Sequence, residues 1–448
     1  MYETPLIGPY NPDDILAWGE GGPMTARRFL ADAFGLADSL PDRPTVLNLA
    51  TSRYEFLVGF AAAILRRQVT LLPQSRAPQT IRQLAASHPG SYVLIGQDDV
   101  IEDLSTVHIR TSGGDATRLR DVPQVPPDQA VAIAFTSGST GQPMPNTKTW
   151  RALTAVGQAT GARLGIKGGD RLSVVATVPH QHMFGLEASV MLPITHGLTM
   201  FGGRPLFPAD IRRTLNELAG QWILVTTPLH LRACVAERLD LRPGRLILSA
   251  TAPLSRDLAE EAEQLFCTEV HEIFGFAEAG SIAERRTIDG ARWRLLDGVR
   301  IEEKEAASMV QAEYLSTPTR IPDRIKIDSE GGFILLGREA DQLNVAGHRV
   351  SLAELNQKLL AIEGVVDGVF FLPDGEADPA TRLMAFVVAP GKRSEEIQEA
   401  LRALVDPVFL PRPLVCVPSL PRNATGKLMR ESVKDLARQW LELRGYGA

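Results

Sequence analysis

Short β-rich runs alternate with amphipathic segments from residue 45 to residue 276. A run at residues 46–49 is followed by a helical pattern at 54–66 and by a second run at 69–72. The same alternation returns at residues 222–226, 229–239, 246–249 and 255–266. Repeated βα units predict an α/β fold, in which parallel sheets are covered by helices on their faces.

The chain changes character after about residue 291. Residues 293–337 form short strand-like runs broken by turns, which predicts a small antiparallel region. Residues beyond 342 indicate a separate α+β unit. Its expected elements are a helix at 352–361, strands at 369–372 and 383–388, a helix at 395–405, a strand at 414–417 and a last helix from about 431. We therefore predict a large N-terminal core over residues 1–338 and a small C-terminal domain over residues 339–448, and the resemblance described below implies that this domain is mobile.

Composition excludes several classes of function. The chain has 448 residues, 44% apolar content and a formal charge of −6 at pH 7, with no long Lys/Arg cluster, so a nucleic-acid partner is not expected. Its start lacks a signal-peptide pattern, and its apolar runs are too short for a membrane span, which favours a cytoplasmic protein. The three cysteines form no C-x-x-C pair, so neither a disulfide framework nor a zinc knuckle is expected.

An apolar run at residues 130–135 leads without a break into Thr136-Ser-Gly-Ser-Thr-Gly-Gln-Pro143. Glycines let backbone N–H groups converge and hydroxyls add donors, so this pattern is typical of a loop that holds a polyphosphate. A plain turn is the alternative, because the spacing differs from that of the Walker loop. The predicted phosphate-binding residues are Thr136, Ser137, Gly138, Ser139, Thr140 and Gly141.

Three distant segments make the phosphate-loop interpretation stronger. They read FGFAEAG at residues 274–280, GREADQLNVAGHRV at 337–350 and LPRNATGKLMR at 420–430. In this order and with the loop at 136, they resemble the core motifs of the adenylate-forming superfamily, which contains acyl-CoA and aryl-CoA synthetases, luciferases and peptide-synthetase adenylation domains. The resemblance implies an enzyme that uses ATP and Mg²⁺ to activate a carboxylic acid as an acyl-adenylate and then transfers the acyl group to a thiol.

Segments at residues 47–56, 70–78 and 142–150 resemble the short ligases of aryl polyene and xanthomonadin-type pigment pathways. This narrower resemblance implies an aromatic carboxylic acid as substrate and the phosphopantetheine thiol of an acyl carrier protein as acceptor. An aryl- or fatty-acyl-CoA synthetase is the rival within enzymes, because coenzyme A offers the same thiol. A catalytically weak adenylate-binding protein is the rival of another class.

The resemblance also assigns roles to residues. Lys427 corresponds to the lysine of the adenylation half-reaction and Glu278 to the glutamate that holds magnesium. Asp323 is expected on the ribose hydroxyls, with Asp328 as a competitor that we favour less because it lies in a turn. The expected nucleotide contacts beyond the loop are Lys148, Ser249, Phe274, Gly275, Asp323 and Arg338.

One departure affects the phosphate site. Met144 stands where the family pattern has a lysine. Lys148, four residues later, either replaces that cation or is a solvated surface lysine, and the sequence leaves both readings open.

For the acid pocket we predict residues from the segment around His182 and from the segment around residue 250. An apolar, partly aromatic slot suits a benzoate or cinnamate ring. Core packing is the alternative for Phe184 and Leu186, and Gly185, where amino-acid-activating relatives have aspartate, disfavours an amino acid. The predicted pocket residues are His182, Phe184, Gly185, Leu186, Ala250 and Thr251.

The resemblance places a hinge after Arg338 and a passage for the thiol arm beyond it. The hinge residue would be Ala340 or Asp341. Gly347 would allow the thiol arm to pass close to the backbone.

Overall fold

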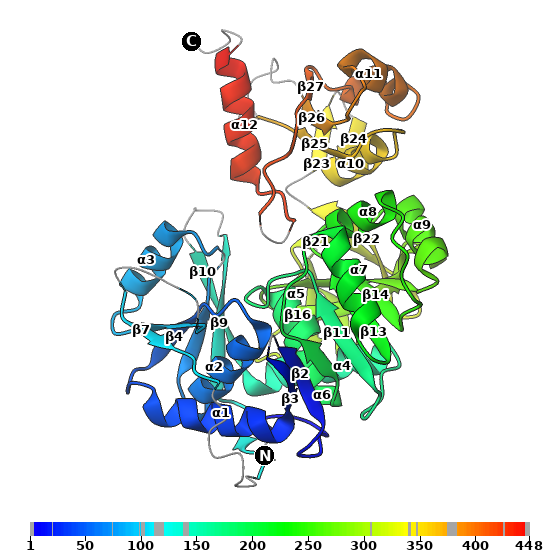
Figure 1. The fold of residues 1–448 in the computed structure, drawn as a ribbon. Coiled ribbons are helices and arrows are strands. Elements are labelled where there is room, and N and C mark those ends of the chain that lie inside the picture. The colour runs from blue at the N-terminus through cyan, green and yellow to red at the C-terminus, as the bar shows by residue number, and fades with distance from the viewer. Residues whose placement is uncertain are drawn as a thin grey trace.

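The structure is a computed structural model, and it describes most of the chain. The described residues are 4–19, 21–73, 75–97, 99, 104–111, 121–137, 143–304, 307–338, 342–345, 348–373, 383–423 and 426–443. Two large sheets form the N-terminal part, and a smaller domain at the C-terminus packs beside them (Figure 1).

The first sheet has six strands in the order β10-β9-β5-β4-β6-β7. All neighbours are parallel except β10, which returns antiparallel along β9. The strands are β4 (Thr45–Asn48), β5 (Val69–Leu72), β6 (Tyr92–Ile95), β7 (Thr106–His108), β9 (Ala130–Ser137) and β10 (Pro143–Thr149). Strand β9 therefore leads into the predicted phosphate loop at the carboxyl edge of a parallel sheet.

The second sheet has eleven strands in the order β21-β22-β17-β16-β15-β14-β13-β11-β12-β2-β3. The run from β15 to β2 is parallel, and the pairs on both sides of it are antiparallel. The parallel strands are β2 (Ile15–Gly19), β11 (Leu172–Ala176), β12 (Thr199–Phe201), β13 (Gln221–Thr226), β14 (Leu246–Ser249) and β15 (Val270–Phe276). The antiparallel strands are β3 (Gly22–Thr25), β16 (Gly280–Arg286), β17 (Arg292–Leu295), β21 (Asp323–Ile327) and β22 (Phe333–Arg338). The predicted combination of parallel sheets and an antiparallel region is thus confirmed.

Two minor antiparallel sheets complete the N-terminal part. Strands β18, β19 and β20 form one, and β1 pairs with β8 in the other. Their bounds are β1 (Thr4–Pro5), β8 (Gln124–Val125), β18 (Val299–Lys304), β19 (Ala307–Ala312) and β20 (Thr319–Arg320).

The central strands of the second sheet are apolar on both faces because helices cover both. Val175 and Leu224 pack into one buried cluster, whereas their neighbours Val174 and Ile223 pack into another. Successive strand residues point to opposite faces, so the run of apolar letters reflects two cores. The helices of the N-terminal part are α1 (Ala26–Ser39), α2 (Arg53–Leu65), α3 (Pro78–Ser87), α4 (Trp150–Arg163), α5 (Met183–Leu186), α6 (Leu192–His196), α7 (Pro208–Glu217), α8 (Pro228–Ala236) and α9 (Arg256–Phe266).

Helix α2 joins the two sheets. It contacts β4 and β5 of the first sheet as well as β2 and β12 of the second, and nearly all of its residues are buried. A helix that is apolar on every side belongs in the interior. The sheets are therefore held in a fixed relation. Their carboxyl edges are close to each other, because Ala50 O after β4 lies 3.0 Å from His180 Nε2 after β11.

The C-terminal domain has its own apolar core. The predicted order helix, strand, strand, helix, strand, helix is found, and a hairpin of β23 and β24 that we did not predict precedes it. The elements are β23 (Gln342–Val345), β24 (His348–Ser351), α10 (Leu352–Leu360), β25 (Asp367–Phe371), β26 (Met384–Val388), α11 (Ser394–Arg402), β27 (Leu414–Cys416) and α12 (Arg430–Leu443). The domain boundary at residue 338 stays a prediction.

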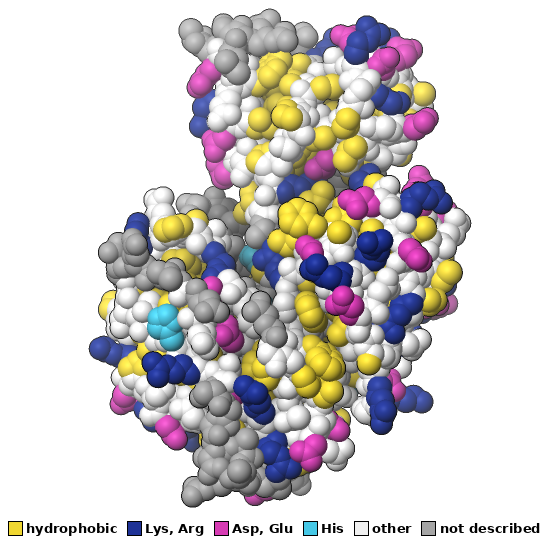
Figure 2. Space-filling model, viewed as in Figure 1, with side chains coloured by type: hydrophobic (Ala, Val, Ile, Leu, Met, Phe, Trp, Pro, Cys, Tyr) yellow, Lys and Arg dark blue, Asp and Glu magenta, His cyan; other side chains and the backbone are white. Residues whose placement is uncertain are grey.

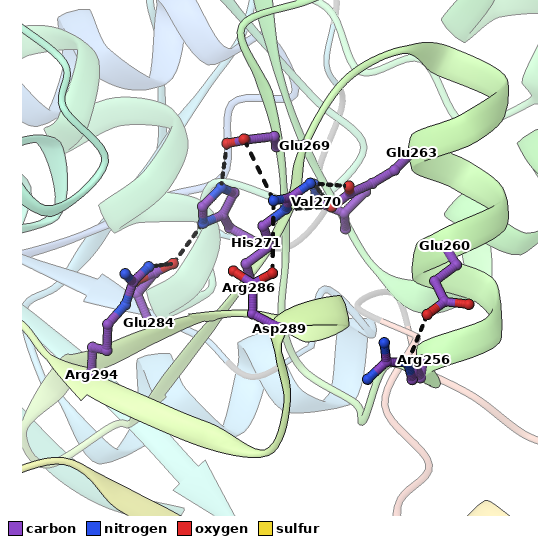
Figure 3. A network of polar contacts seen from close by, with 10 residues as sticks. All are labelled: Arg256, Glu260, Glu263, Glu269, Val270, His271, Glu284, Arg286, Asp289 and Arg294. Carbon is purple, nitrogen blue, oxygen red and sulfur yellow. Dashed lines mark hydrogen bonds and ion pairs between the residues drawn. The ribbon is translucent and has the colours of Figure 1, made fainter.

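A charged network fixes the base of the β15–β16 hairpin (Figure 3). His271 Nδ1 lies 2.6 Å from Glu284 Oε1, and Arg294 donates to the same buried carboxylate at 3.0 Å. Arg286 reaches across to Glu263 on α9. The far end of this hairpin, which carries Glu278, is thereby presented from a rigid support.

Every helix within the described ranges is too short or too polar to cross a bilayer.

Candidate functional site

The carboxyl ends of the parallel strands bring several predicted site residues to one edge. Strand β14 ends at Ser249, β15 runs through Gly275, and the segment that follows β11 leads to His182. Adjacent parallel strands end at the same edge, where ligands bind in open α/β sheets. Ser249, Gly275 and His182 come from three separate motifs, and this sheet assembles them.

His182 stands at the N-terminal end of α5 and is half-buried. Burial lowers the pKa of its imidazole to about 4, and the positive charges of Arg204 and Lys427 act in the same direction. His182 is therefore neutral at physiological pH. Lys427 belongs to the C-terminal domain, so its influence on His182 places the catalytic candidate of one domain near the pocket candidate of the other.

Gly185 and Leu186 are placed by packing. A Cβ at Gly185 would lie 1.9 Å from the carbonyl oxygen of Pro179, so no side chain fits there. Leu186 is fully buried in the main core, and Phe184 packs partly buried against a second cluster. The core-packing alternative thus describes Leu186. The glycine at 185 has a steric reason, and it no longer argues against an amino-acid substrate.

The end of β14 shows two unusual features. Ser249 is fully buried, and its Oγ has no hydrogen-bond partner among the described residues. Thr251 has a φ of 76°, in the left-handed region that threonine rarely adopts. Strained residues and unsatisfied polar groups gather at binding sites, which agrees with the predicted role of this segment. Ala250 between them is buried.

The phosphate loop itself lies mostly outside the described residues. Gly138, Ser139, Thr140 and Gly141 are not described, whereas the backbones of Thr136 and Ser137 belong to β9. Met144 pairs with Thr136 across the hairpin and its side chain is 55% exposed. The position without the expected lysine therefore stands beside the loop and faces solvent.

Lys148 is neither at the surface nor free to move. Its side chain is 5% exposed, and its Nζ donates a hydrogen bond to the carbonyl oxygen of Glu278 at 2.9 Å. Burial lowers the pKa of this ammonium, while Glu187 and Glu278 raise it. The surface alternative for Lys148 is wrong because a partner 130 residues away in sequence draws it inward. Direct contact with a phosphate stays a prediction.

Glu187 was not predicted as a site residue. Its Oε2 accepts hydrogen bonds from the backbone N of Ser281 at 3.0 Å and from the Ser281 hydroxyl at 2.5 Å. Burial raises the pKa of this carboxyl, and Ser281 and Lys148 oppose that shift. Lys148 thus fixes the turn at Glu278, and Glu187 fixes the start of β16 at Ser281. A lone glutamate in the apolar run at residues 183–194 was the available signal.

Glu278 lies in the turn between β15 and β16, and it is exposed. No cluster of three or more histidine, cysteine or acidic side chains that could hold a metal is found within the described ranges. One exposed carboxylate still fits Mg²⁺, because this ion takes one or two protein carboxylates and completes its shell with phosphate oxygens and water.

The two predicted ribose residues face each other across two strands. Asp323 of β21 and Arg338 of β22 are Cα partners in the antiparallel ladder. The competitor Asp328 accepts from Arg292 Nε at 2.6 Å and from the amides of Glu330 and Gly332 at 2.9 Å, and Arg292 lowers its pKa to about 2. Asp328 therefore organises its own turn, as the sequence suggested.

Phe274 packs into an aromatic cluster. Its ring centroid lies 5.5 Å from those of Trp293 and Phe333. At Gly275, a Cβ would come within 2.4 Å of the carbonyl oxygen of Gly280. The backbone here is so close to its neighbour that glycine is required, and the Phe274 ring supports the hairpin.

Lys427 is presented by a braced loop between β27 and α12, which extends toward the larger part (Figure 1). Arg422 donates to Gly426 O at 2.6 Å and forms a bidentate pair with Asp367. Gly426 has a φ of 74°, which favours glycine, and a Cβ there would lie 3.3 Å from Thr227 Oγ1. Lys427 itself is exposed.

The hinge and thiol-passage candidates cannot be placed. Ala340, Asp341 and Gly347 lie outside the described residues.

Comparisons with known proteins agree with this geometry. The 4-coumarate–CoA ligase of Cereibacter sphaeroides is 31% identical over 301 residues, which cover 65% of this chain and 69% of that protein. An acetyl-coenzyme A synthetase of Mycobacterium bovis is 37% identical over 123 residues, so the matching segment spans 18% of that longer relative.

Solved structures share the fold at low identity. ATP-bound MatB from Rhodopseudomonas palustris has a TM-score of 0.80 at 19% identity, with 95% of this chain and 97% of that chain covered. The anthranilate CoA ligase AuaEII in complex with anthranoyl-AMP has a TM-score of 0.79 at 17% identity, with 95% and 94% covered. The family of AMP-binding enzymes matches residues 45–306, which is more than half of the chain. The protein therefore belongs to the family of AMP-binding enzymes, as the order of its motifs predicted.

Proposed function

We propose that this protein is an ATP-dependent ligase that activates an aromatic carboxylic acid as an acyl-adenylate and transfers it to the phosphopantetheine thiol of an acyl carrier protein. The observation that carries the adenylation step is the position of the Lys427 loop at the carboxyl edge of the second sheet, where a Cβ at Gly426 would lie 3.3 Å from Thr227 Oγ1 and where the charge of Lys427 helps to lower the pKa of His182. An ammonium at this position meets both the carboxylate and the α-phosphate, where charge develops during adenylation.

Glu278 and the phosphate loop would complete the ATP site. Mg²⁺, when bound, neutralises charge on the phosphates as pyrophosphate departs. Glu278 holds that ion with one carboxylate, and the backbone donors of residues 136–141 orient the β- and γ-phosphates. Asp323 and Arg338, opposed across β21 and β22, bind the ribose hydroxyls.

An aromatic acid is supported by the similarity to relatives such as 4-coumarate–CoA ligase and by the partly buried rings of His182 and Phe184 among the pocket candidates. We propose a hydroxybenzoate or hydroxycinnamate. His182 is neutral, so its imidazole can accept or donate a hydrogen bond to an oxygen of the substrate without a charge. Because Lys427 acts on the same imidazole, that oxygen can belong to the activated carboxylate as well as to a ring hydroxyl.

The acceptor has two candidates with the same thiol. Carrier protein is favoured by the resemblance of residues 47–56, 70–78 and 142–150 to the pigment ligases, and coenzyme A by the names of the relatives. The test is acid-dependent exchange of labelled pyrophosphate into ATP over benzoic, cinnamic, fatty and amino acids, followed by thioester formation with each acceptor. No exchange with any acid would favour an adenylate-binding protein instead.

A further inference from the structure

The phosphate site is short of a cation. Met144 occupies the position of the expected lysine, and the Nζ of Lys148 is buried against the carbonyl oxygen of Glu278. A polyphosphate or a phosphate ester needs positive partners at short range. Two arginines, Arg76 and Arg204, lie at the carboxyl edges of the two sheets.

Arg76 stands at the correct edge. Strand β5 runs parallel to β9, with Leu72 paired to Ala134, so both strands deliver the chain to the same side. Arg76 follows the end of β5 by four residues, at the same edge of the sheet at which β9 ends. Its Nη2 donates to the carbonyl oxygen of Leu49 at 2.6 Å, which fixes the guanidinium at the end of β4. The side chain is exposed.

Arg204 approaches the same place from the second sheet. It follows β12, and its Nε donates to Thr177 O at 3.0 Å. The carbonyl groups that anchor the two arginines belong to segments in contact, because Ala50 O, next to Leu49, lies 3.0 Å from His180 Nε2, three residues after Thr177. In agreement with this geometry, burial lowers the pKa of the Arg204 guanidinium and the charge of Arg76 lowers it further. Arg53 braces this segment from below by donating to Gly203 O at 2.9 Å.

The neighbours of Arg204 carry the same sign. Its charge lowers the pKa of both His182 and His230 after the larger effect of burial, and Lys427 acts on His182 as well. Within the part of the chain that the structure describes, the charged side chains that perturb Arg204 and these two imidazoles are all basic. Figure 2 shows Lys, Arg and His side chains in the hollow between the C-terminal domain and the larger part. On the Arg76 side, the carboxylate of Asp99 opposes the fall in the arginine's pKa and so offsets part of the positive charge. The basic groups around Arg204 still repel one another, and an anion between them would relieve that repulsion.

We propose that Arg76 and Arg204 bind a phosphate group; where that group is the pyrophosphate end of ATP, they supply the positive charge that Met144 does not. This inference rests on the proposed function, because the enzyme then has two phosphate-bearing ligands. The phosphate is either the pyrophosphate end of ATP or the phosphate at the base of the pantetheine arm. Both are tetrahedral anions that guanidinium groups bind through paired N–H donors.

The test uses Arg204→Gln and Arg76→Gln in the full chain, with Arg212→Gln on the exposed face of α7 as the matched control. Pyrophosphate–ATP exchange gives KM for ATP and for pyrophosphate. A second arm starts from supplied acyl-adenylate and compares phosphopantetheine with pantetheine that lacks the phosphate. Loss of one charge-assisted contact predicts a rise in KM on the order of 10- to 100-fold in one arm. Arg204→Lys should recover part of the loss.

A rise confined to the exchange arm assigns the cluster to ATP. A loss of the preference for phosphorylated pantetheine assigns it to the acceptor. Unchanged KM values in both arms, or changes equal to those of Arg212→Gln, overturn the proposal.

Calorimetric titration with inorganic pyrophosphate or phosphopantetheine keeps the test separate from the proposed function, because it needs no turnover. If the wild-type protein catalyses no exchange but binds either probe, and Arg204→Gln abolishes that binding, the phosphate site is supported and the ligase function is refuted. If neither probe distinguishes wild type from variant, the cluster falls.

Discussion

Replacing Lys148 by methionine tests the internal support of the Glu278 turn. Methionine has nearly the length of lysine and fills the same buried space without a charge. The substitution removes the donor to Glu278 O, 2.9 Å away, and the positive charge that opposes protonation of Glu187. Ser281 would still donate to Glu187.

The expected loss of stability has two parts. A hydrogen bond that involves a charged group contributes about 1.5–3 kcal/mol, and easier burial of methionine offsets some of it. The second part is the cost of an ionised Glu187 without a cation nearby. Breaking a direct buried ion pair costs about 3–5 kcal/mol, but Lys148 acts on Glu187 only through space, so this second part is smaller, on the order of 1 kcal/mol. We expect a loss of about 1–2 kcal/mol when Glu187 is protonated and of about 2–3 kcal/mol when it is ionised.

This difference gives the loss a predictable pH dependence. The folded-state pKa of Glu187 is raised above its unfolded value, so its contribution to stability is present below the unfolded pKa and is lost as pH rises through the folded pKa. Without Lys148 the folded pKa rises further, and the variant loses more at high pH. The lowered pKa of Lys148 adds to this trend. Burial of the charged ammonium destabilises the wild-type protein most at low pH, so the wild type gains stability relative to the variant as pH rises. The loss should therefore grow as pH rises above the ordinary range of a glutamate carboxyl.

Urea unfolding followed by tryptophan fluorescence measures this, since Trp150 lies two residues from the substitution and is buried. Midpoints are compared, because a chain of two domains need not unfold in one step. Glu187→Gln is the matched control, and the double variant Lys148→Met, Glu187→Gln should lose the pH dependence. A loss that is constant with pH, or a double variant that simply adds the single losses, would refute the reasoning.

Four further outcomes are expected. Lys427→Ala should suppress pyrophosphate exchange by about 100-fold or more and leave thioester formation from supplied acyl-adenylate nearly intact; equal loss in both half-reactions contradicts this. Glu278→Gln should shift the magnesium titration of exchange to higher concentration, and an unchanged titration would place the ion elsewhere. His182→Ala should reduce the discrimination between hydroxylated and unsubstituted aromatic acids more than it reduces the overall rate of exchange. In the wild type this discrimination should not vary with pH above about pH 5, because the pKa of His182 is about 4. Gly426→Ala should impair exchange, because a left-handed residue with a Cβ costs about 1–2 kcal/mol and that Cβ would press against Thr227 Oγ1. An exchange rate equal to that of the wild type would show that the loop docks differently.

The sheets were predictable because their cause is local. Central strands covered on both faces read as continuous apolar runs, so β13 and β14 could be placed from the sequence. The order of the C-terminal elements was predictable because the apolar residues of each helix or strand recur with the period of that element. The β23–β24 hairpin was missed because its residues are polar and alternate weakly.

The site was predictable as a set of motifs, whereas the role of single residues was less so. Lys148 looks like a surface residue by type, and only a carbonyl group 130 residues away explains its burial. Gly185 looked like a missing anchor for an amino acid, yet the carbonyl oxygen of Pro179 leaves no room for any side chain there. Arg76 and Arg204 come from different sheets, so no spacing in the sequence relates them.

The position of Lys427 depends on contacts in both domains, and this has a mechanistic consequence. Within the C-terminal domain, Arg422 fixes the loop by bonding Asp367 and the carbonyl oxygen of Gly426. Between the domains, the same loop approaches Thr227 after β13, and Lys427 acts on His182 after β11. A braced loop moves as one body with its domain, so any rotation of that domain withdraws Lys427 from the carboxylate without unfolding the loop. Under the proposed function, one lysine would then serve adenylation alone, and the thiol would react in an arrangement from which this charge is absent.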